Sequence, residues 1–494
     1  MQKVKTLILT LLFLLPLSLF AQGRRFVHYN CMERMGEQVA KVPAGPRKSL
    51  PDLYNEWDST RVYNVPVLLM EFSDKSFSMD DPLDHYQRIF NEEGYNLGVG
   101  PGCVADYFRE QSNGLFRPHF DIFGPVKIDK GSKECGKYGG DSMSDAIMQL
   151  ADSINLDFSL YDWNESGIAN SFIVIYAGYG GNEDTAVAKN SIWPNTGYTT
   201  GTCREHVLQL SASNEMWASN NLAGIGTICH EFCHTLGLPD VYPTSGSEFS
   251  VWDEWELMDG GNYINNGWCP PTMTAHMKIM LGWLQPEVLD APATITDLKP
   301  VAEGGKVYKI PTEDENEYYL LENRQWKGWD LRIPGHGLLI SHVDYSPTEW
   351  RYNSVNTRPN HHRYDLVHAD NMDYTTWEDL VGKGAHLGGH SRLLSGSAYP
   401  YVTDSITNNA LTDTSEPAAI TYSGTGLLSK PITGIRETEG AITFQFMGGV
   451  IPDGIVELKH EEDKSNASYD LTGRRVGRGY RGLVIRNHKK IVIH

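Results

Sequence analysis

The chain has 494 residues, of which 40% are apolar and 25 are tyrosines, a composition that supports more than one hydrophobic core and excludes general disorder. Its 62 acidic side chains outnumber the 42 basic ones, which gives a formal net charge of −20. A surface this acidic repels phosphate backbones, so the sequence argues against nucleic acid as a partner.

Residues 1–21 have the pattern of a cleavable signal peptide. Lys3 and Lys5 precede an apolar run over residues 7–20, and the small side chain of Ala21 offers a cleavage site. The run is about 14 residues long, whereas a membrane-spanning helix needs roughly 20. The sequence therefore predicts export to a secreted or cell-surface location, without a stable membrane span.

Residues 22–60 are interpreted as a leader or pro-segment, because prolines and glycines interrupt any periodicity there. Cys31 in this segment is a candidate thiolate ligand in a latent precursor. The catalytic region expected over residues 61–290 opens with an apolar run at 65–72, which predicts a buried strand. Further along this region we expect a helix over 104–111 and strands over 120–128 and 171–177.

A short polar segment lies between the last two of these strands. Asp162, Asn164 and Ser166 place oxygen-bearing side chains at alternate positions before Gly167, as in the first half of a calcium-binding loop. The twelfth position is Ile173 rather than glutamate, so a complete EF-hand loop is not expected. Two interpretations stay open, a structural calcium site and a plain Asx turn.

A helix predicted over residues 221–237 carries the strongest chemical motif. His230 and His234 are four residues apart, so their imidazoles lie on one face of a helix and both can bind a single Zn²⁺ ion. Glu231 lies next to them, where it can act as a general base on zinc-activated water. The spacing therefore predicts a catalytic zinc site.

The third zinc ligand has more than one candidate. Gly237 admits a positive φ angle, and a turn there would bring Asp240 back to the metal. Asp240 also has an ordinary interpretation as a turn residue at a helix end. Glu254 and Glu256 are the alternative ligands, since they follow His234 at the spacing found in another type of zincin.

Residues 255–261 resemble the methionine turn that lies beneath the zinc ion in metzincins. Met258 would form its soft, apolar floor. Tyr263 follows shortly afterwards and is a candidate donor to the oxyanion of the transition state. A packed aromatic ring is the alternative interpretation of Tyr263.

Helical periodicity fades over residues 291–450. Short alternating runs take its place, separated by Gly, Pro and Asn clusters, at residues 307–310, 318–321, 337–343 and 442–446. We expect a β-rich, sandwich-like companion region packed against the catalytic unit.

Residues 451–494 form a tail that becomes basic towards its end. Apolar residues alternate at 482–485 and 491–493, which predicts a small β unit. The tail resembles the C-terminal sorting signal of type IX secretion, and this resemblance implies an outer-membrane export machinery as a partner. An ordinary terminal hairpin with a basic face is the alternative.

Seven cysteines are too few and too scattered for a disulfide scaffold. Cys103 and Cys135 are the candidate pair for a single bridge. Cys229 and Cys233 lie four apart on the predicted zinc helix and are interpreted as small packing residues.

Between about residues 65 and 345 the chain resembles the immune inhibitor A family of secreted bacterial metallopeptidases, which are zincins with an HExxHxxGxxD pattern. The resemblance covers His230 to Asp240 and several blocks in the same order, at residues 67–74, 104–116, 172–178, 191–194, 281–284, 318–324 and 337–344. It implies an α+β zincin (metzincin-like) catalytic domain followed by the β-rich sandwich-like region, with His230, Glu231, His234 and Met258 in their motif roles.

Together these features predict a secreted zinc-dependent endopeptidase that hydrolyses peptide bonds in extracellular proteins. Zn²⁺ is the expected cofactor, Ca²⁺ is a structural candidate, and the expected partners are protein or peptide substrates. The alternative is a surface protein- or glycan-binding module on an inactive peptidase scaffold. The intact His230, Glu231 and His234 favour the enzyme over this alternative.

Overall fold

The computed structural model describes residues 57–449 except 98, 184, 246–249 and 383–389, together with residues 468–469, 475–476, 481–486 and 489–493. The chain divides into two compact units, which meet between Gly449 and Val450. The predicted signal peptide, nearly all of the predicted leader and Cys31 lie outside the described residues. Among the helices that the structure describes, none is both long and apolar enough to cross a membrane.

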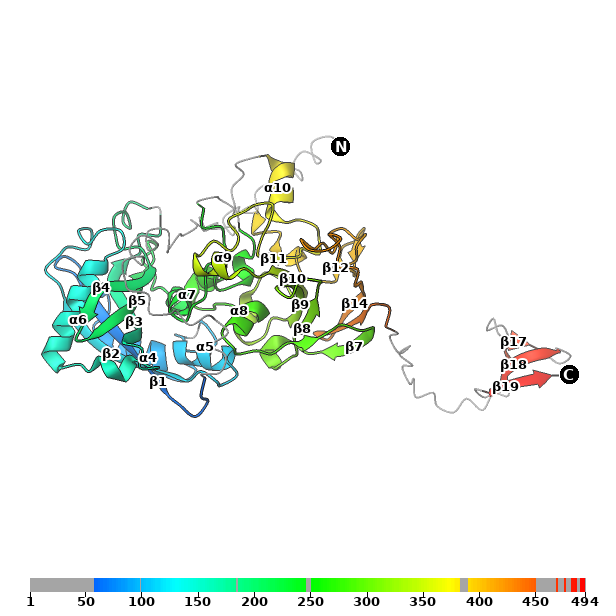
Figure 1. The fold of residues 1–494 in the computed structure, drawn as a ribbon, viewed down its shortest axis with the longest axis horizontal. Helices are drawn as coiled ribbons and strands as arrows, with labels where there is room; N and C mark the ends of the chain where they lie inside the picture. The colour runs from blue at the N-terminus through cyan, green and yellow to red at the C-terminus, as the bar shows by residue number, and fades with distance from the viewer. Residues whose placement is uncertain are drawn as a thin grey trace, which may run out of the picture. The chain divides into compact units, whose positions relative to one another are not determined.

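A five-stranded sheet forms the core of the catalytic region, with the strand order β2-β1-β3-β5-β4 (Figure 1). Its strands are β1 (Tyr63–Glu71), β2 (Pro118–Lys127), β3 (Ile168–Tyr179), β4 (Asn195–Cys203) and β5 (His206–Met216). Neighbouring strands are parallel except for β4, which lies antiparallel to β5 at the edge of the sheet. The strands predicted over 65–72, 120–128 and 171–177 are confirmed as β1, β2 and β3.

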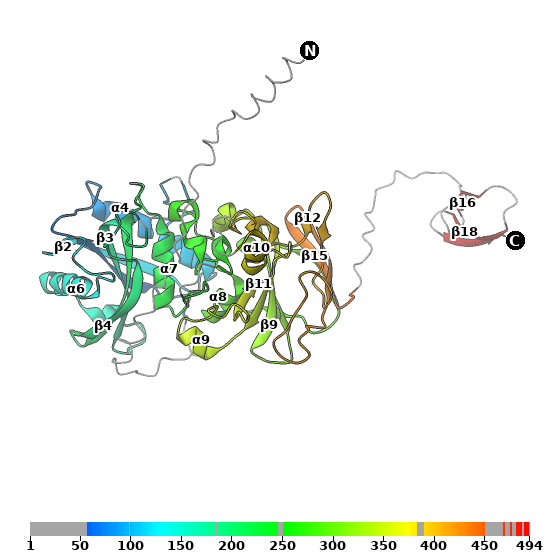
Figure 2. The same ribbon diagram turned by 90° about the horizontal axis from the view of Figure 1, so that it is seen from above.

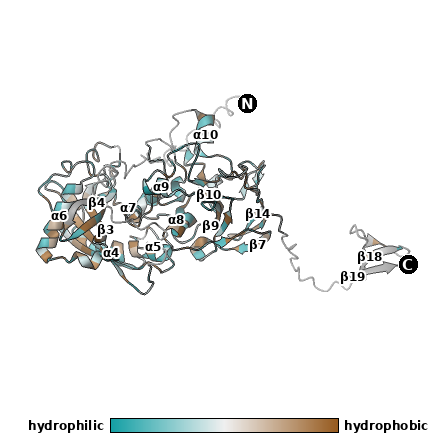
Figure 3. Cartoon of the chain, in the orientation of Figure 1, coloured by the Kyte–Doolittle hydropathy of each residue, from teal (hydrophilic) through white to brown (hydrophobic). Residues whose placement is uncertain are grey.

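Helices cover both faces of this sheet because its strands are apolar on both sides. Val67 and Leu69 of β1 point into one core, and Leu68 and Met70 point into a second core on the opposite face. The first core contains residues of α4 (Pro82–Asn91), α5 (Val104–Gln111) and α7 (Ile225–Thr235). The second contains the buried apolar residues of α6 (Gly140–Ile154), a helix along which hydrophobic and hydrophilic residues are interspersed (Figure 3).

The helix predicted over 104–111 is confirmed as α5, whereas the zinc helix is shorter than predicted. Helix α7 begins at Ile225 and ends at Thr235, rather than spanning 221–237. Residues 221–223 instead extend the pairing at the end of β5, where the Trp217 N–H donates to the Asn221 carbonyl at 2.9 Å and the Ala223 N–H donates to the Glu215 carbonyl at 2.8 Å. Because these backbone groups already have partners, the helix starts after them.

A second five-stranded sheet, of order β11-β10-β9-β8-β6, follows α7 in the stack of layers (Figure 2). Its strands are β6 (Glu287–Val288), β8 (Tyr308–Pro311), β9 (Glu317–Arg324), β10 (Gly337–Asp344) and β11 (Tyr364–Leu366). All eight residues of β9 are buried. Tyr318 and Leu320 point into the first core, and Tyr319 and Leu321 point into a third core on the opposite face of the sheet. The first core therefore contains residues from both sides of position 290.

A three-stranded sheet, of order β14-β15-β7, closes the third core from the other side. Its strands are β7 (Ala293–Leu298), β14 (Ile432–Thr438) and β15 (Ala441–Phe446). The predicted strands at 307–310, 318–321, 337–343 and 442–446 are confirmed as parts of β8, β9, β10 and β15. The other elements among the described residues of this unit are the helices α8 (Ala275–Met280), α9 (Pro347–Arg351) and α10 (Tyr374–Val381) and the strands β12 (Tyr401–Val402) and β13 (Thr407–Asn408). Its described 3-10 segments are η2 (Phe158–Tyr161), η3 (Asp253–Trp255), η4 (Gly260–Gly267), η5 (Val301–Glu303), η6 (Gly328–Arg332) and η7 (Leu394–Gly396).

The smaller unit contains a sheet of order β17-β16-β18-β19. Its strands are β16 (Ser468–Tyr469), β17 (Arg475–Val476), β18 (Gly482–Arg486) and β19 (Lys489–Ile493). The predicted small β unit is therefore present, and its sorting role stays a prediction.

The predicted Cys103–Cys135 bridge is wrong. The six cysteines in the described part of the chain are all free thiols. Cys103 instead caps α5, where its Sγ accepts a hydrogen bond from the Asp106 N–H at 3.4 Å.

Candidate metal centre

Helix α7 lies against η4 because a glycine allows the two backbones to approach each other. A Cβ atom added at Gly226 would lie only 2.0 Å from the carbonyl oxygen of Asn262 in η4. Any other side chain at this position would push the helix away from the segment that follows the methionine turn. Gly226 therefore allows the short distance between the backbones of α7 and η4.

The end of α7 is a tight turn that the sequence anticipated. Gly237 has a φ of +104°, which confirms the predicted positive φ angle. The Gly237 N–H donates to the His234 carbonyl at 3.0 Å and the Leu238 N–H donates to the Cys233 carbonyl at 3.1 Å, the two bonds of a Schellman motif. This turn also places the Leu238 carbonyl 2.8 Å from Nδ1 of His234.

Beyond the turn, the chain returns to the two histidines. The Asp240 Oδ1 atom lies 3.1 Å from Nε2 of His230 and 3.2 Å from Nε2 of His234. Within the described residues, these three form the one group of His, Cys, Asp or Glu side chains whose ligand atoms lie close enough for one ion, all within 4.8 Å of one another. All three side chains are buried.

Both imidazoles are oriented by backbone carbonyls. Nδ1 of His230 lies 2.8 Å from the Leu257 carbonyl, as Nδ1 of His234 does from the Leu238 carbonyl. A carbonyl only accepts hydrogen bonds, so each Nδ1 carries a hydrogen, and Nε2 is the ring nitrogen that faces Asp240 in both histidines. This is the arrangement in which histidines bind a metal ion through Nε2.

The charges at the centre fit a cation. Burial would raise the pKa of Asp240, but the two imidazoles outweigh it and hold that pKa below its usual value. Burial lowers the pKa of His234, but the Asp240 carboxylate offsets this and brings it to about 9. Neither His234 Nε2 nor Asp240 Oδ1 has a hydrogen-bond partner among the described residues outside this group of three, although both are buried. Two imidazole nitrogens and a carboxylate oxygen are a typical ligand set for catalytic zinc.

Glu231 is buried beside the two histidines and is held by a residue of the edge strand. The Thr196 Oγ1 atom, on β4, lies 2.9 Å from Oε2 of Glu231 and 2.9 Å from its carbonyl oxygen. Burial raises the pKa of Glu231, while the neighbouring imidazoles lower it by less. The sequence did not predict Thr196, because no motif connects it with a helix 35 residues further along the chain.

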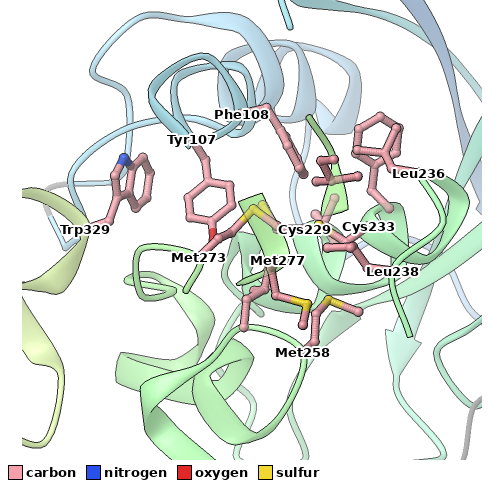
Figure 4. Packing of buried hydrophobic residues seen from close by; sticks show 14 of the residues in the cluster. Tyr107, Phe108, Cys229, Cys233, Leu236, Leu238, Met258, Met273, Met277 and Trp329 are labelled. Atoms are coloured by element: carbon pink, nitrogen blue, oxygen red, sulfur yellow. The ribbon is translucent and has the colours of Figure 1, made fainter. Parts of the chain in front are cut away.

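Met258 is fully buried beneath α7, in a cluster with Met273, Met277 and the helix residues Cys229 and Cys233 (Figure 4). The backbone carbonyls of this turn also make hydrogen bonds that orient residues of the candidate metal centre. The Met258 carbonyl accepts a hydrogen bond from the Val241 N–H at 3.0 Å, next to the Leu257 carbonyl that orients His230. Two consecutive carbonyls of this turn therefore hold both the helix ligand and the residue after Asp240.

Cys229 and Cys233 lie in this apolar cluster and not among the ligand atoms (Figure 4). Burial raises the pKa of both thiols well above the usual value, so both stay neutral. A neutral thiol is a poor metal ligand, and the two side chains act as packing residues.

The alternative third ligands occupy other positions. The Glu256 carboxylate accepts hydrogen bonds from the Met258 N–H at 3.2 Å and from the Thr274 N–H at 2.7 Å. Glu254 lies half-buried in η3. The structure groups Asp240 with the histidines, and Glu256 instead shapes the methionine turn.

Tyr263 makes a hydrogen bond and an aromatic contact with neighbouring side chains. The Tyr263 hydroxyl lies 3.4 Å from Asn182 Nδ2, and its ring packs edge-on against Trp217 at 5.7 Å between centroids. Its role as an oxyanion donor stays a prediction.

The Asp162 carboxylate accepts hydrogen bonds from the Ser166 N–H at 2.9 Å and the Gly167 N–H at 2.7 Å. This is an Asx-type turn, one of the two interpretations of the sequence. A calcium ion bound by Asp162, Asn164 and Ser166 stays a prediction.

Comparison with known proteins identifies relatives of the segment that carries this centre. Residues 56–285 match the immune inhibitor A peptidase M6 catalytic domain. The chain is 24% identical over 267 residues to the pre-pro-metalloprotease PrtV of Vibrio cholerae, in an alignment that covers 45% of this chain and 27% of that protein. It is 26% identical over 275 residues to immune inhibitor A of Bacillus thuringiensis subsp. alesti, which covers 45% of this chain and 39% of that protein. The chain therefore spans less than half the length of these two relatives.

Proposed function

We propose that this chain is a secreted zinc-dependent endopeptidase that cleaves extracellular proteins. The proposal starts from the match of residues 56–285 to the immune inhibitor A peptidase M6 catalytic domain. One observation carries the proposal. Nε2 of His230, Nε2 of His234 and Oδ1 of Asp240 converge in a buried position beside Glu231. Burying such a polar group without hydrogen-bond partners for all its atoms is costly unless the group binds an ion.

His230, His234 and Asp240 would hold the zinc ion and leave one position of a tetrahedral site open. Bound there, zinc supplies the positive charge that lowers the pKa of water and polarises a carbonyl group. The carbonyls of Leu238 and Leu257 keep both imidazoles in the tautomer that binds metal through Nε2.

Glu231 would act as the general base. Its carboxylate accepts a proton from the attacking water and then passes it to the leaving amine. Burial raises the pKa of Glu231, which moves it towards the pH at which such a group works. The Thr196 hydroxyl, 2.9 Å from Oε2, limits the rotation of the carboxylate.

The edge strand supports an extended peptide as the substrate. In the described sheet, β4 pairs only with β5, and its outer side can accept the main chain of a peptide as a further strand. Because Thr196 belongs to β4 and contacts Glu231, a peptide paired with this strand would pass close to the base. An antiparallel edge strand beside a helix with two histidines also supports a zincin fold for the catalytic region. The third core, which contains residues of both companion sheets, supports a sandwich-like companion region.

The test is casein hydrolysis by the purified chain and by Glu231→Gln, each with its zinc content measured. We expect the variant to keep about one zinc per chain and to lose activity about 10²- to 10⁴-fold, the usual contribution of a general base. Glu315→Gln, at an exposed glutamate, is the matched control and should retain full activity. If the wild type holds zinc but cleaves nothing, the binding-module alternative replaces the proposal. If the wild type holds no zinc, the proposal is wrong.

A further inference from the structure

The second carboxylate oxygen of Asp240 has a partner from a distant part of the chain. Asn353 Nδ2 donates to Asp240 Oδ2 at 2.6 Å, and the Asp240 N–H donates to Asn353 Oδ1 at 2.6 Å. One amide therefore holds both the side chain and the backbone of the same residue. Asn353 lies outside residues 56–285, in the connection between α9 and β11.

Asn353 is itself firmly held. Its side chain is buried, its N–H donates to the Trp350 carbonyl at 3.3 Å, and its carbonyl accepts a hydrogen bond from the Thr244 hydroxyl at 2.5 Å. Its φ of +55° lies in the left-handed region, which asparagine tolerates better than most residues. Every polar group of Asn353 is thus used in hydrogen bonds.

Three residues later, Asn356 makes a second contact with the same stretch of the catalytic region. Its Nδ2 donates to the Val241 carbonyl at 2.7 Å and to the Tyr364 carbonyl at 2.8 Å. Its Oδ1 accepts hydrogen bonds from the backbone of residues 363 and 364, both at 3.0 Å. We call residues 353–364 the clamp segment, because its two asparagines hold residues 240 and 241.

We propose that Asn353 is a positioning residue for the third metal ligand, and that the companion region is therefore part of the metal centre. This inference rests on the proposed function. By donating to Oδ2, Asn353 leaves Oδ1 as the single Asp240 oxygen that faces the two histidines. A carboxylate held in this way binds a metal ion through one oxygen, as a four-coordinate zinc site requires, whereas a free carboxylate can bind through both.

Asparagine is the side chain that this role needs. It presents a donor and an acceptor side by side, which match the carboxylate oxygen and the N–H of Asp240. Aspartate at position 353 would place a second carboxylate against the first, and alanine would leave Oδ2 without its donor.

The test measures the zinc affinity of the full chain and of Asn353→Ala by competition with a chelating dye. Loss of an outer partner of a metal ligand typically lowers metal affinity about 10- to 100-fold, and we expect a loss in that range. Asn356→Ala is the matched control, since it removes an asparagine from the same clamp segment but leaves the Asp240 carboxylate untouched. We expect Asn356→Ala to lower the Tm of the metal-free protein and to keep a zinc affinity close to that of the wild type.

A second measurement separates positioning from general loosening. In the Co²⁺-loaded chain, Asn353→Ala should change the visible absorption spectrum, because Asp240 becomes free to bind through both oxygens, and Asn356→Ala should not. Equal losses of zinc affinity in the two variants, or an unchanged affinity in Asn353→Ala, would overturn the inference. If Asn353→Ala does not fold, Asn353→Leu, which is close in size and uncharged but has no donor for Asp240 Oδ2, takes its place in both measurements.

The outcomes also distinguish this inference from the proposed function. A wild-type chain that binds zinc without cleaving casein contradicts only the function, and the affinity comparison still stands. A wild-type chain that cleaves casein, with a zinc affinity that does not depend on residue 353, contradicts only the inference.

Discussion

Helix α7 and the clamp segment act on the same metal centre from very different distances along the chain. The two histidines of α7 are oriented by carbonyls that lie four and 27 residues away. Asp240 is oriented by Asn353, which lies 113 residues away. The histidines therefore depend on the helix and the turns around it, while Asp240, the proposed third ligand, depends on the packing of a separate sheet against the catalytic region.

The largest expected effect comes from removing the companion region, which carries Asn353. A chain that ends at residue 285 lacks the clamp segment and also the companion residues of the first core, among them Leu320, Trp329, Leu339 and Tyr364. Because this exposes a large apolar surface, we expect no cooperative thermal unfolding transition and no zinc binding. Differential scanning calorimetry and a zinc titration measure the two properties.

The control truncates the chain at residue 449, which removes only the smaller compact unit. Its transition and its zinc affinity should match those of the full chain. If the chain that ends at residue 285 unfolds cooperatively and binds zinc, the catalytic region needs no companion, and Asp240 does not depend on the clamp segment.

The second largest expected effect concerns the packing of α7 against η4. In Gly226→Ala, the new Cβ would lie 2.0 Å from a backbone oxygen of η4, so α7 must move. We expect a loss of about 1–3 kcal/mol in the free energy of unfolding, as for other overpacked sites. Urea denaturation of the metal-free chain measures it.

Gly140→Ala in α6 is the matched control, because nothing lies within 4 Å of a Cβ atom at that position. Alanine favours helix there, so we expect a gain of up to about 1 kcal/mol. If both variants change stability in the same direction, close packing of α7 on η4 does not set the position of the helix.

The smallest effect concerns the sheet that carries the clamp segment. The Glu317 carboxylate, on β9, accepts hydrogen bonds from His342 Nε2 at 2.7 Å and from the N–H groups of Tyr422 and Ser423 at 2.6 and 3.0 Å. Burial would raise the pKa of Glu317, but these donors lower it from about 4.5 to about 2. Because the folded-state pKa is depressed, this carboxylate stabilises the fold above pH 4.5 and loses that contribution as the pH falls to about 2.

Glu317→Gln should therefore cost about 1 kcal/mol at pH 7, the usual net contribution of a hydrogen bond, and the cost should vanish near pH 2. Chemical unfolding of the two proteins across this range measures the difference. Glu315→Gln, in the exposed part of the same hairpin, should show no such pH dependence. A difference between wild type and Glu317→Gln that stays constant with pH would contradict this account.

Much of the fold follows from local sequence patterns. Apolar runs predicted β1 and β3, because strands buried on both faces are largely apolar. Short alternating runs predicted parts of β9 and β10. The edge strand β4 was missed, since its residues are mostly Thr, Gly and Asn and show no alternation. The start of α7 was misplaced because residues 221–223 bind to the end of β5, a contact that no local pattern reveals.

The sequence by itself determined the parts of the metal centre that depend on nearby residues. Helical spacing aligned His230 with His234 and placed Glu231 beside them, and Gly237 supplied the positive φ angle that reverses the chain. Only the tertiary structure decided the rest. It brought Asp240 to the histidines, gave Glu256 a role in the methionine turn, and added Thr196 and Asn353. The physical reason is clearest for Thr196 and Asn353, which lie 35 and 113 residues from their partners, so these contacts exist only after the parts of the chain that carry them have packed together.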